Sequence, residues 1–324
     1  MRVLPWLLGA ALLIWGIRFV SLDEVVDILR RLRLWQIAVL VVANAVVLAT
    51  ISGRWWLLLA GAGRRLPFLP LVGYRLAVFG LSYFTPGPHV GGEPLQVLLV
   101  EKNHGVPRSA ALAAVALDKA IEFTVNFAFL LLGIAAALQW RVVPRTAGQQ
   151  ALGLAAALLV LPLLYLGLTA RGFHPASRGF APVARRWPRL ASAAATVAES
   201  ERMIGRTFRA APRPFIAAVA VTFLSWAALI AEYWLMASFL GTNLTLPQLV
   251  VALTAARISI LLLLPAGLGA LELSQALAFG ALGLDPAFGI SLGLLIRARD
   301  TALGLFGLWW GGRVVGKWAS RSVG

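Results

Sequence analysis

The chain contains no cysteine, which excludes disulfides, iron–sulfur clusters and thiol chemistry. Its three histidines, His89, His104 and His174, are scattered without the spacing of metal ligands, so we expect no bound metal. It lacks a nucleotide-binding motif, and we expect no ATP hydrolysis and no cofactor. Charge is scarce too, since 13% of the residues are charged, against about 25% in an ordinary soluble domain. This composition excludes such a domain.

Apolar sequence is abundant instead. Hydrophobic residues make up 60% of the 324 residues, and runs long enough to span a bilayer recur over the whole length. We therefore predict an all-α polytopic membrane protein with about eight transmembrane helices. The predicted segments are residues 3–20, 34–61, 68–84, 107–138, 149–170, 213–240, 246–263 and 286–312.

The net charge of +16 is placed mainly in loops. Residues 171–213 hold nine arginines against Glu199 and Glu201. In a membrane protein such bases set the orientation and meet anionic lipid head groups, so we expect no nucleic-acid partner and place this loop in the cytoplasm. Because no polar segment is long enough for a separate soluble catalytic domain, residues 1–324 are predicted to form one transmembrane domain.

Two stretches rich in proline and glycine interrupt apolar helices in the same way, each with a glutamate seven residues after its first proline. Both residue types end helices, and backbone groups freed inside a bilayer need protein or water around them. We predict that residues 85–102 and 264–283 form re-entrant hairpins or pairs of half-helices. The residues at the breaks are Pro86, Gly87, Gly91, Gly92 and Glu93, then Pro265, Gly267, Gly269 and Glu272.

The repetition extends beyond the breaks. A glycine follows each break, with a base 14 residues after it and an acid 17 residues after it, and an arginine lies on the helix before each break. The matched residues are Gly105, Lys119, Glu122 and Arg75 in the first set and Gly283, Arg297, Asp300 and Arg257 in the second. We predict two related halves, roughly 1–145 and 146–324, as in transporters whose sites lie at a repeat interface.

Eleven charged residues fall in predicted membrane segments or breaks, where each costs about 2.5–3.5 kcal/mol at the bilayer centre. We predict that bases and half-helix N-termini face a central polar cavity and bind an anion, above all phosphate. The carboxylates would orient the bases or take up a proton. The predicted substrate-binding residues are Arg75, Glu93, Lys119, Glu122, Arg257, Glu272, Arg297 and Asp300, and no catalytic residue is predicted.

At these residues the chain resembles the flippase-like transmembrane domain of lysylphosphatidylglycerol synthases, found also as stand-alone bacterial and archaeal membrane proteins. The resemblance spans essentially the whole chain. It rests on Thr85-Pro86-Gly87, Gly91-Gly92-Glu93-Pro94, Asp118-Lys119, Pro265, Gly267-Leu268-Gly269, Glu272 and Arg297. It implies re-entrant helices around a polar cavity and movement of an anionic or aminoacylated lipid head group between leaflets.

The chain departs from the family pattern at two places. Pro88-His89 replaces a frequent glycine, and Gln96 stands where the family often has a base. The resemblance does not extend to the tRNA-dependent synthase domain, so we expect this chain not to make lysyl-lipid itself.

The leading hypothesis is a lipid translocase, rather than an enzyme, for a phospholipid or a polyprenyl-phosphate-linked lipid in a bacterial or archaeal cell membrane. One alternative is a polytopic glycosyltransferase that uses a polyprenyl-phosphate sugar. Such enzymes keep an acidic residue in the first non-cytoplasmic loop, and Asp23, Glu24 and Asp27 follow the first predicted helix. A third hypothesis is a membrane scaffold for a lipid-modifying enzyme, in which the hairpin charges would tolerate substitution. The sequence gives no oligomeric state.

Overall fold

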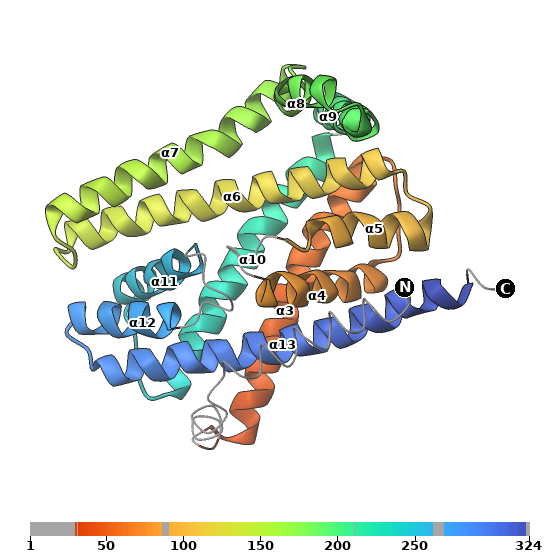
Figure 1. Ribbon diagram of the computed structural model, residues 1–324. Coiled ribbons are helices and arrows are strands. Elements are labelled where there is room, and N and C mark those ends of the chain that lie inside the picture. Colours follow the sequence, from red (N-terminus) through yellow and green to blue (C-terminus); the bar gives the residue numbers. More distant parts are fainter. Residues whose placement is uncertain (1–29, 31, 86–90, 211, 262–268, 322–324) are drawn as a thin grey trace.

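The computed structural model describes residue 30 and residues 32–85, 91–210, 212–261 and 269–321, and all regular structure in these ranges is helical (Figure 1). The prediction of an all-α chain is thus confirmed. The α-helices are α3 (Leu34–Gly61), α4 (Phe68–Phe84), α5 (Glu93–His104), α6 (Arg108–Gln139), α7 (Arg145–Ala170), α8 (Pro175–Arg186), α9 (Ala191–Ala210), α10 (Pro212–Phe239), α11 (Leu246–Ile260), α12 (Ala270–Ala281) and α13 (Pro286–Arg321), with a 3-10 turn, η1, at Pro188–Leu190.

Four helices, α3, α6, α7 and α10, are long and apolar enough to cross a membrane. Helices α4 and α11 are shorter apolar helices, and the 36-residue α13 carries three charged residues near its middle. Seven of the eight predicted segments coincide with these helices to within a few residues. The predicted segment 3–20 lies outside the described residues, and the count of eight crossings stays a prediction.

Proline and glycine set the helix ends around both breaks. Helix α5 has Gly92 at its N-cap and Pro94 in its first turn, and it ends at Gly105, whose φ of 63° is a left-handed cap that favours glycine. Helix α12 likewise begins after Gly269, with φ of 72°. Helix α6 starts directly after Pro107. The described glycines of both breaks therefore stand at the N-terminal ends of short helices.

Helices from the two predicted halves pack against one another (Figure 1). Helix α3 lies along α10, α4 along α13, and α6 contacts α11 as well as α7. Small residues permit the close approach of α4 and α13, because a Cβ on Gly307 would collide with the carbonyl oxygen of Leu76. This cross-packing brings the charged segments of both halves into one region.

Helix starts in the two halves are related by a constant spacing. Helices α10, α11 and α13 begin 178 residues after α3, α4 and α6, and α12 begins 177 residues after α5. Two buried apolar clusters accompany this order. One is built mainly on α3, α4, α5 and α6, and the other mainly on α10, α11, α12 and α13.

The basic region 171–213 is helical, as α8, η1 and α9. The buried carboxylate of Glu201 on α9 accepts hydrogen bonds from the backbone N–H groups of Ala176 and Ser177, both at 2.8 Å, and so caps the start of α8. Helix α9 also contacts α6 and α7, which fixes the arginine-bearing helices on the body of the protein.

Candidate functional site

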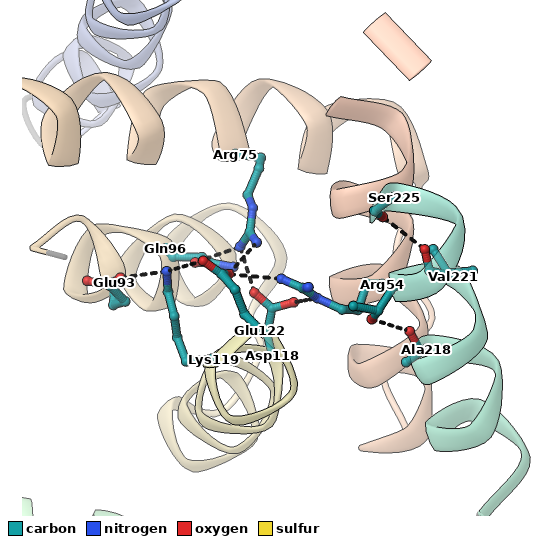
Figure 2. Close-up of polar contacts among 11 residues, drawn as sticks. Arg54, Arg75, Glu93, Gln96, Asp118, Lys119, Glu122, Ala218, Val221 and Ser225 are labelled. Atoms are coloured by element: carbon teal, nitrogen blue, oxygen red, sulfur yellow. Dashed lines mark hydrogen bonds and ion pairs between the residues drawn. The ribbon is translucent and has the colours of Figure 1, made fainter. Parts of the chain in front are cut away.

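A first charged cluster gathers side chains from α3, α4, α5 and α6 (Figure 2). Asp118 of α6 is fully buried, with Oδ1 2.5 Å from Nε of Arg54 on α3 and Oδ2 2.8 Å from Nη1 of Arg75 on α4. Glu122, one turn further along α6, faces the same two guanidinium groups at 3.0 and 3.7 Å. Buried charges need paired partners of this kind, because removing one partner leaves the other uncompensated.

The same cluster ties α5 to α6. The Nζ of Lys119 lies 3.1 Å from Oε1 of Glu93 and 3.5 Å from Oε1 of Glu122. The other oxygen of Glu93 accepts from the backbone N–H of Gly91 at 2.7 Å. Gly92 donates its N–H to Ser82 of α4 at 2.9 Å. The glutamate and the glycines of the first break therefore fix the start of α5 against its neighbours.

Gln96, where the family often has a base, is fully buried beside Arg75. The Nη1 of Arg75 donates to the side-chain amide oxygen of Gln96. A base at this position would place a second positive charge against Arg75, so the neutral amide suits this arrangement.

A second charged cluster joins α10, α12 and α13. The Nη2 of Arg297 on α13 lies 2.5 Å from Oε2 of Glu272 on α12. Arg299 faces Glu232 of α10 at 2.9 Å and its own neighbour Asp300 at 2.8 Å. The Glu272–Arg297 pair links the short helix after the second break to the following long helix, as Glu93 and Lys119 do after the first.

Arg257 on α11 has a different environment. Its guanidinium carbon lies 4.9 Å from the centre of the Trp226 ring on α10, and that ring packs on Phe129 of α6 with centroids 4.7 Å apart. Within the described part of the chain, no carboxylate oxygen lies within 4.0 Å of the Arg257 side-chain nitrogens. The aromatic face is its one recorded side-chain contact in that part of the chain.

A pocket of about 340 Å³ is lined by residues of both clusters. Pockets of this size hold small ligands or the polar part of larger ones. Six bases and three acids among the described residues line it: Arg54, Arg75, Lys119, Arg257, Arg297 and Arg299, with Glu122, Glu232 and Asp300. Its wall also includes the neutral polar side chains of Asn44, Ser82, Asn126, Ser225 and Ser259.

The structure brings the eight predicted site residues into this region. Six of them line the pocket, and the other two, Glu93 and Glu272, each bind a lysine or arginine that does. Outside the described residues lie Pro86, Gly87, Pro265 and Gly267 of the breaks and Asp23, Glu24 and Asp27 of the glycosyltransferase hypothesis.

Sequence reasoning missed Arg54, although the signal was present. An arginine within the apolar stretch 34–61 carries the same cost as the other membrane charges. Trp226 was also missed, because interfacial belts account for tryptophans in general and only the fold places this one over Arg257. Asp118, Glu232 and Arg299 are charged membrane residues by sequence, and the contacts show that they complete the ion pairs.

Comparison with known proteins identifies the family. The profile described as lysylphosphatidylglycerol synthase TM region matches residues 2–307. A UPF0104 membrane protein of Pyrococcus horikoshii is 23% identical over 308 residues, which cover 90% of each chain. No solved structure matches the chain. The chain therefore belongs to the family of lysylphosphatidylglycerol synthase transmembrane regions.

Proposed function

We propose that this protein is a lipid translocase that moves a phosphate-bearing or anionic lipid head group between the leaflets of a bacterial or archaeal cell membrane. The observation that carries the proposal is the pocket lined by six bases and three acids within a bundle of apolar helices. A polar, charged pocket is what a head group needs in order to cross hydrocarbon, where bare charge is expensive.

The ion pairs supply a mechanism for transient binding. Each carboxylate neutralises one or two bases while the pocket is empty, so the charges are tolerated in apolar surroundings. An anionic head group offers the same charge and similar hydrogen-bond geometry as a carboxylate. It can therefore take over a base from its carboxylate, or bind a base that lacks one, without leaving a bare charge behind.

The arrangement of helices supports a transporter built from two related halves. Helices α4, α5 and α6 correspond to α11, α12 and α13 by the 178-residue spacing, and the Glu93–Lys119 pair corresponds to Glu272–Arg297. The 12-residue helices α5 and α12 extend about 18 Å, shorter than the roughly 30 Å hydrocarbon core. This length fits re-entrant half-helices, which transporters use around sites at the repeat interface.

Lipid movement in proteoliposomes tests the proposal. Fluorescent phosphatidylglycerol added to both leaflets is bleached from outside with dithionite, and the protein should raise the fraction that becomes accessible beyond that of empty vesicles. The double variant Glu93→Gln with Glu272→Gln should abolish this activity, because it frees the bases that hold α5 and α12. Glu199→Gln is the matched control, since Glu199 pairs with Arg202 on the exposed face of α9.

Folding has to be separated from activity in this test. Both variants should elute as the wild type does on size exclusion and retain a cooperative thermal transition. Unchanged lipid movement in a folded double variant would refute the site assignment. Absence of movement by the wild-type protein for phosphatidylglycerol and for a polyprenyl-phosphate lipid would refute the translocase function.

A further inference from the structure

We infer that Arg257 is the residue that binds the phosphate of the head group, and that Trp226 holds its guanidinium in position to do so. This inference rests on the proposed function and deepens it, because it assigns the anion to one side chain.

The distribution of ion pairs singles out Arg257. Five of the six bases that line the pocket have a carboxylate within ion-pair distance. Arg299 takes two carboxylates of the second cluster, Glu232 and Asp300. Within the described residues Arg257 takes none, although it lies in the same pocket. An arginine without a counter-charge in an apolar bundle is costly, and a ligand anion would remove that cost.

The spacing of the two halves shows where a carboxylate is missing. In the first half, Asp118 sits between Arg54 and Arg75. The residue 178 positions later is Ile296, which is buried in the second apolar cluster. The second half thus has an apolar side chain at the position corresponding to the shared carboxylate, while its own arginine on α11 is retained. The charge balance of that half is completed by a ligand rather than by the protein.

The contact with Trp226 leaves Arg257 able to bind an anion. A cation over a ring face gains attraction from the ring quadrupole, and stacking occupies the flat face of the guanidinium. The N–H groups lie at the edge of that plane, where they can donate in parallel to two phosphate oxygens. Phe129 packs on Trp226 and so restricts the ring's movement. Asn126 and Ser225, which line the same pocket, offer neutral donors to the remaining oxygens.

One uncommitted base also predicts the charge of the preferred head group. A phosphodiester carries a single negative charge that one guanidinium can neutralise. A diphosphate would need further bases, and the remaining bases of the pocket already have carboxylate partners. We therefore assign the site to a single phosphate, as in a glycerophospholipid head group.

Binding of short-chain lipids to the full-length protein in detergent tests this inference. The probes are dihexanoylphosphatidylglycerol, dihexanoylglycerol without phosphate, and inorganic phosphate, each followed by the shift of the thermal unfolding midpoint. The phospholipid should stabilise the wild type far more than either other probe. Arg257→Gln should weaken its binding by about tenfold or more, the effect of losing a charged hydrogen bond, while Arg257→Lys should retain part of it.

Arg313→Gln provides the matched control. Arg313 also lies over a tryptophan ring, 3.9 Å from the centre of Trp309, but it is exposed and lies outside the residues that line the pocket. Its loss should leave phospholipid binding unchanged. Binding by Arg257→Gln within twofold of wild type would overturn the inference. Equal stabilisation by inorganic phosphate would overturn the assignment to a lipid head group.

Two further comparisons keep the inference separable from folding and from the proposed function. If Arg257→Gln does not fold, Trp226→Leu, which keeps the arginine but removes its ring, should weaken phospholipid binding by about threefold, and unchanged binding would count against the inference. Phospholipid binding that depends on Arg257 without lipid movement would refute the translocase while supporting this site. Lipid movement with Arg257-independent binding would do the reverse.

Discussion

The ammonium group of Lys119 lies 3.1 Å from a carboxylate oxygen of Glu93, and this ion pair joins α6 to the short helix that follows the first break. Arg297 and Glu272 form the same contact at 2.5 Å after the second break. In each half a base near the middle of a long helix holds the glutamate at the start of a 12-residue helix. The short helices are therefore held at the pocket by charge as well as by packing.

Exchanging the charges of the first pair tests this contact. Glu93→Lys alone should destabilise the protein, because it places two positive charges together, and adding Lys119→Glu should recover part of the loss. Coupled neighbours of this kind show interaction energies of about 0.5–3 kcal/mol, and partial exposure of both side chains favours the lower part of that range. Thermal unfolding in detergent measures the effect, and additive changes in the double variant would show that the pair is not coupled.

Removing the carboxylate shared by two arginines should cost more. Asp118→Asn leaves Arg54 and Arg75 with Glu122 as their common partner, and breaking a buried pair costs about 3–5 kcal/mol. Glu101→Gln is the control, because its pair with Arg108 is largely exposed and should contribute about 1 kcal/mol or less. Chemical denaturation compares the two, and similar losses would contradict the buried geometry.

Replacing Gln96 tests why this chain departs from the family pattern. Gln96→Lys would place an ammonium group next to the guanidinium of Arg75 in a fully buried position, so it should lower the unfolding midpoint more than Gln96→Met. Methionine removes the hydrogen bond without adding charge. Equal midpoints for the two variants would mean that the position tolerates a base.

The close approach of α4 and α13 predicts a strong size dependence. Gly307→Val would push side-chain atoms against the Leu76 carbonyl and should destabilise the protein by about 1–3 kcal/mol or more. Gly153→Val on the exposed face of α7 meets no atom within 4 Å and should have little effect. Unfolding midpoints of both variants check the prediction, and a tolerated Gly307→Val would argue against this helix contact.

The sequence determined much of the local structure. Apolar length predicted seven described helices within a few residues, because a segment that crosses hydrocarbon must satisfy its backbone internally. Proline and glycine predicted where the short helices begin, because they end helices regardless of their surroundings. The matched charges around the breaks indicated a site, since buried charge is too expensive to be retained without partners.

The tertiary structure decided which charges meet. Spacing along one helix suggested the partner Glu122 for Lys119, whereas the partner Glu93 comes from another helix. Arg54 is placed beside Asp118 only by the packing of α3 on α6, and the cation on Trp226 arises only where α10 meets α11. Sequence periodicity reports which face of a helix is polar, but helix packing depends on the shapes of two surfaces at once. The sequence by itself therefore determined the helices and their charges, and the tertiary structure alone selected the pairs and left Arg257 facing the pocket without a carboxylate among the described residues.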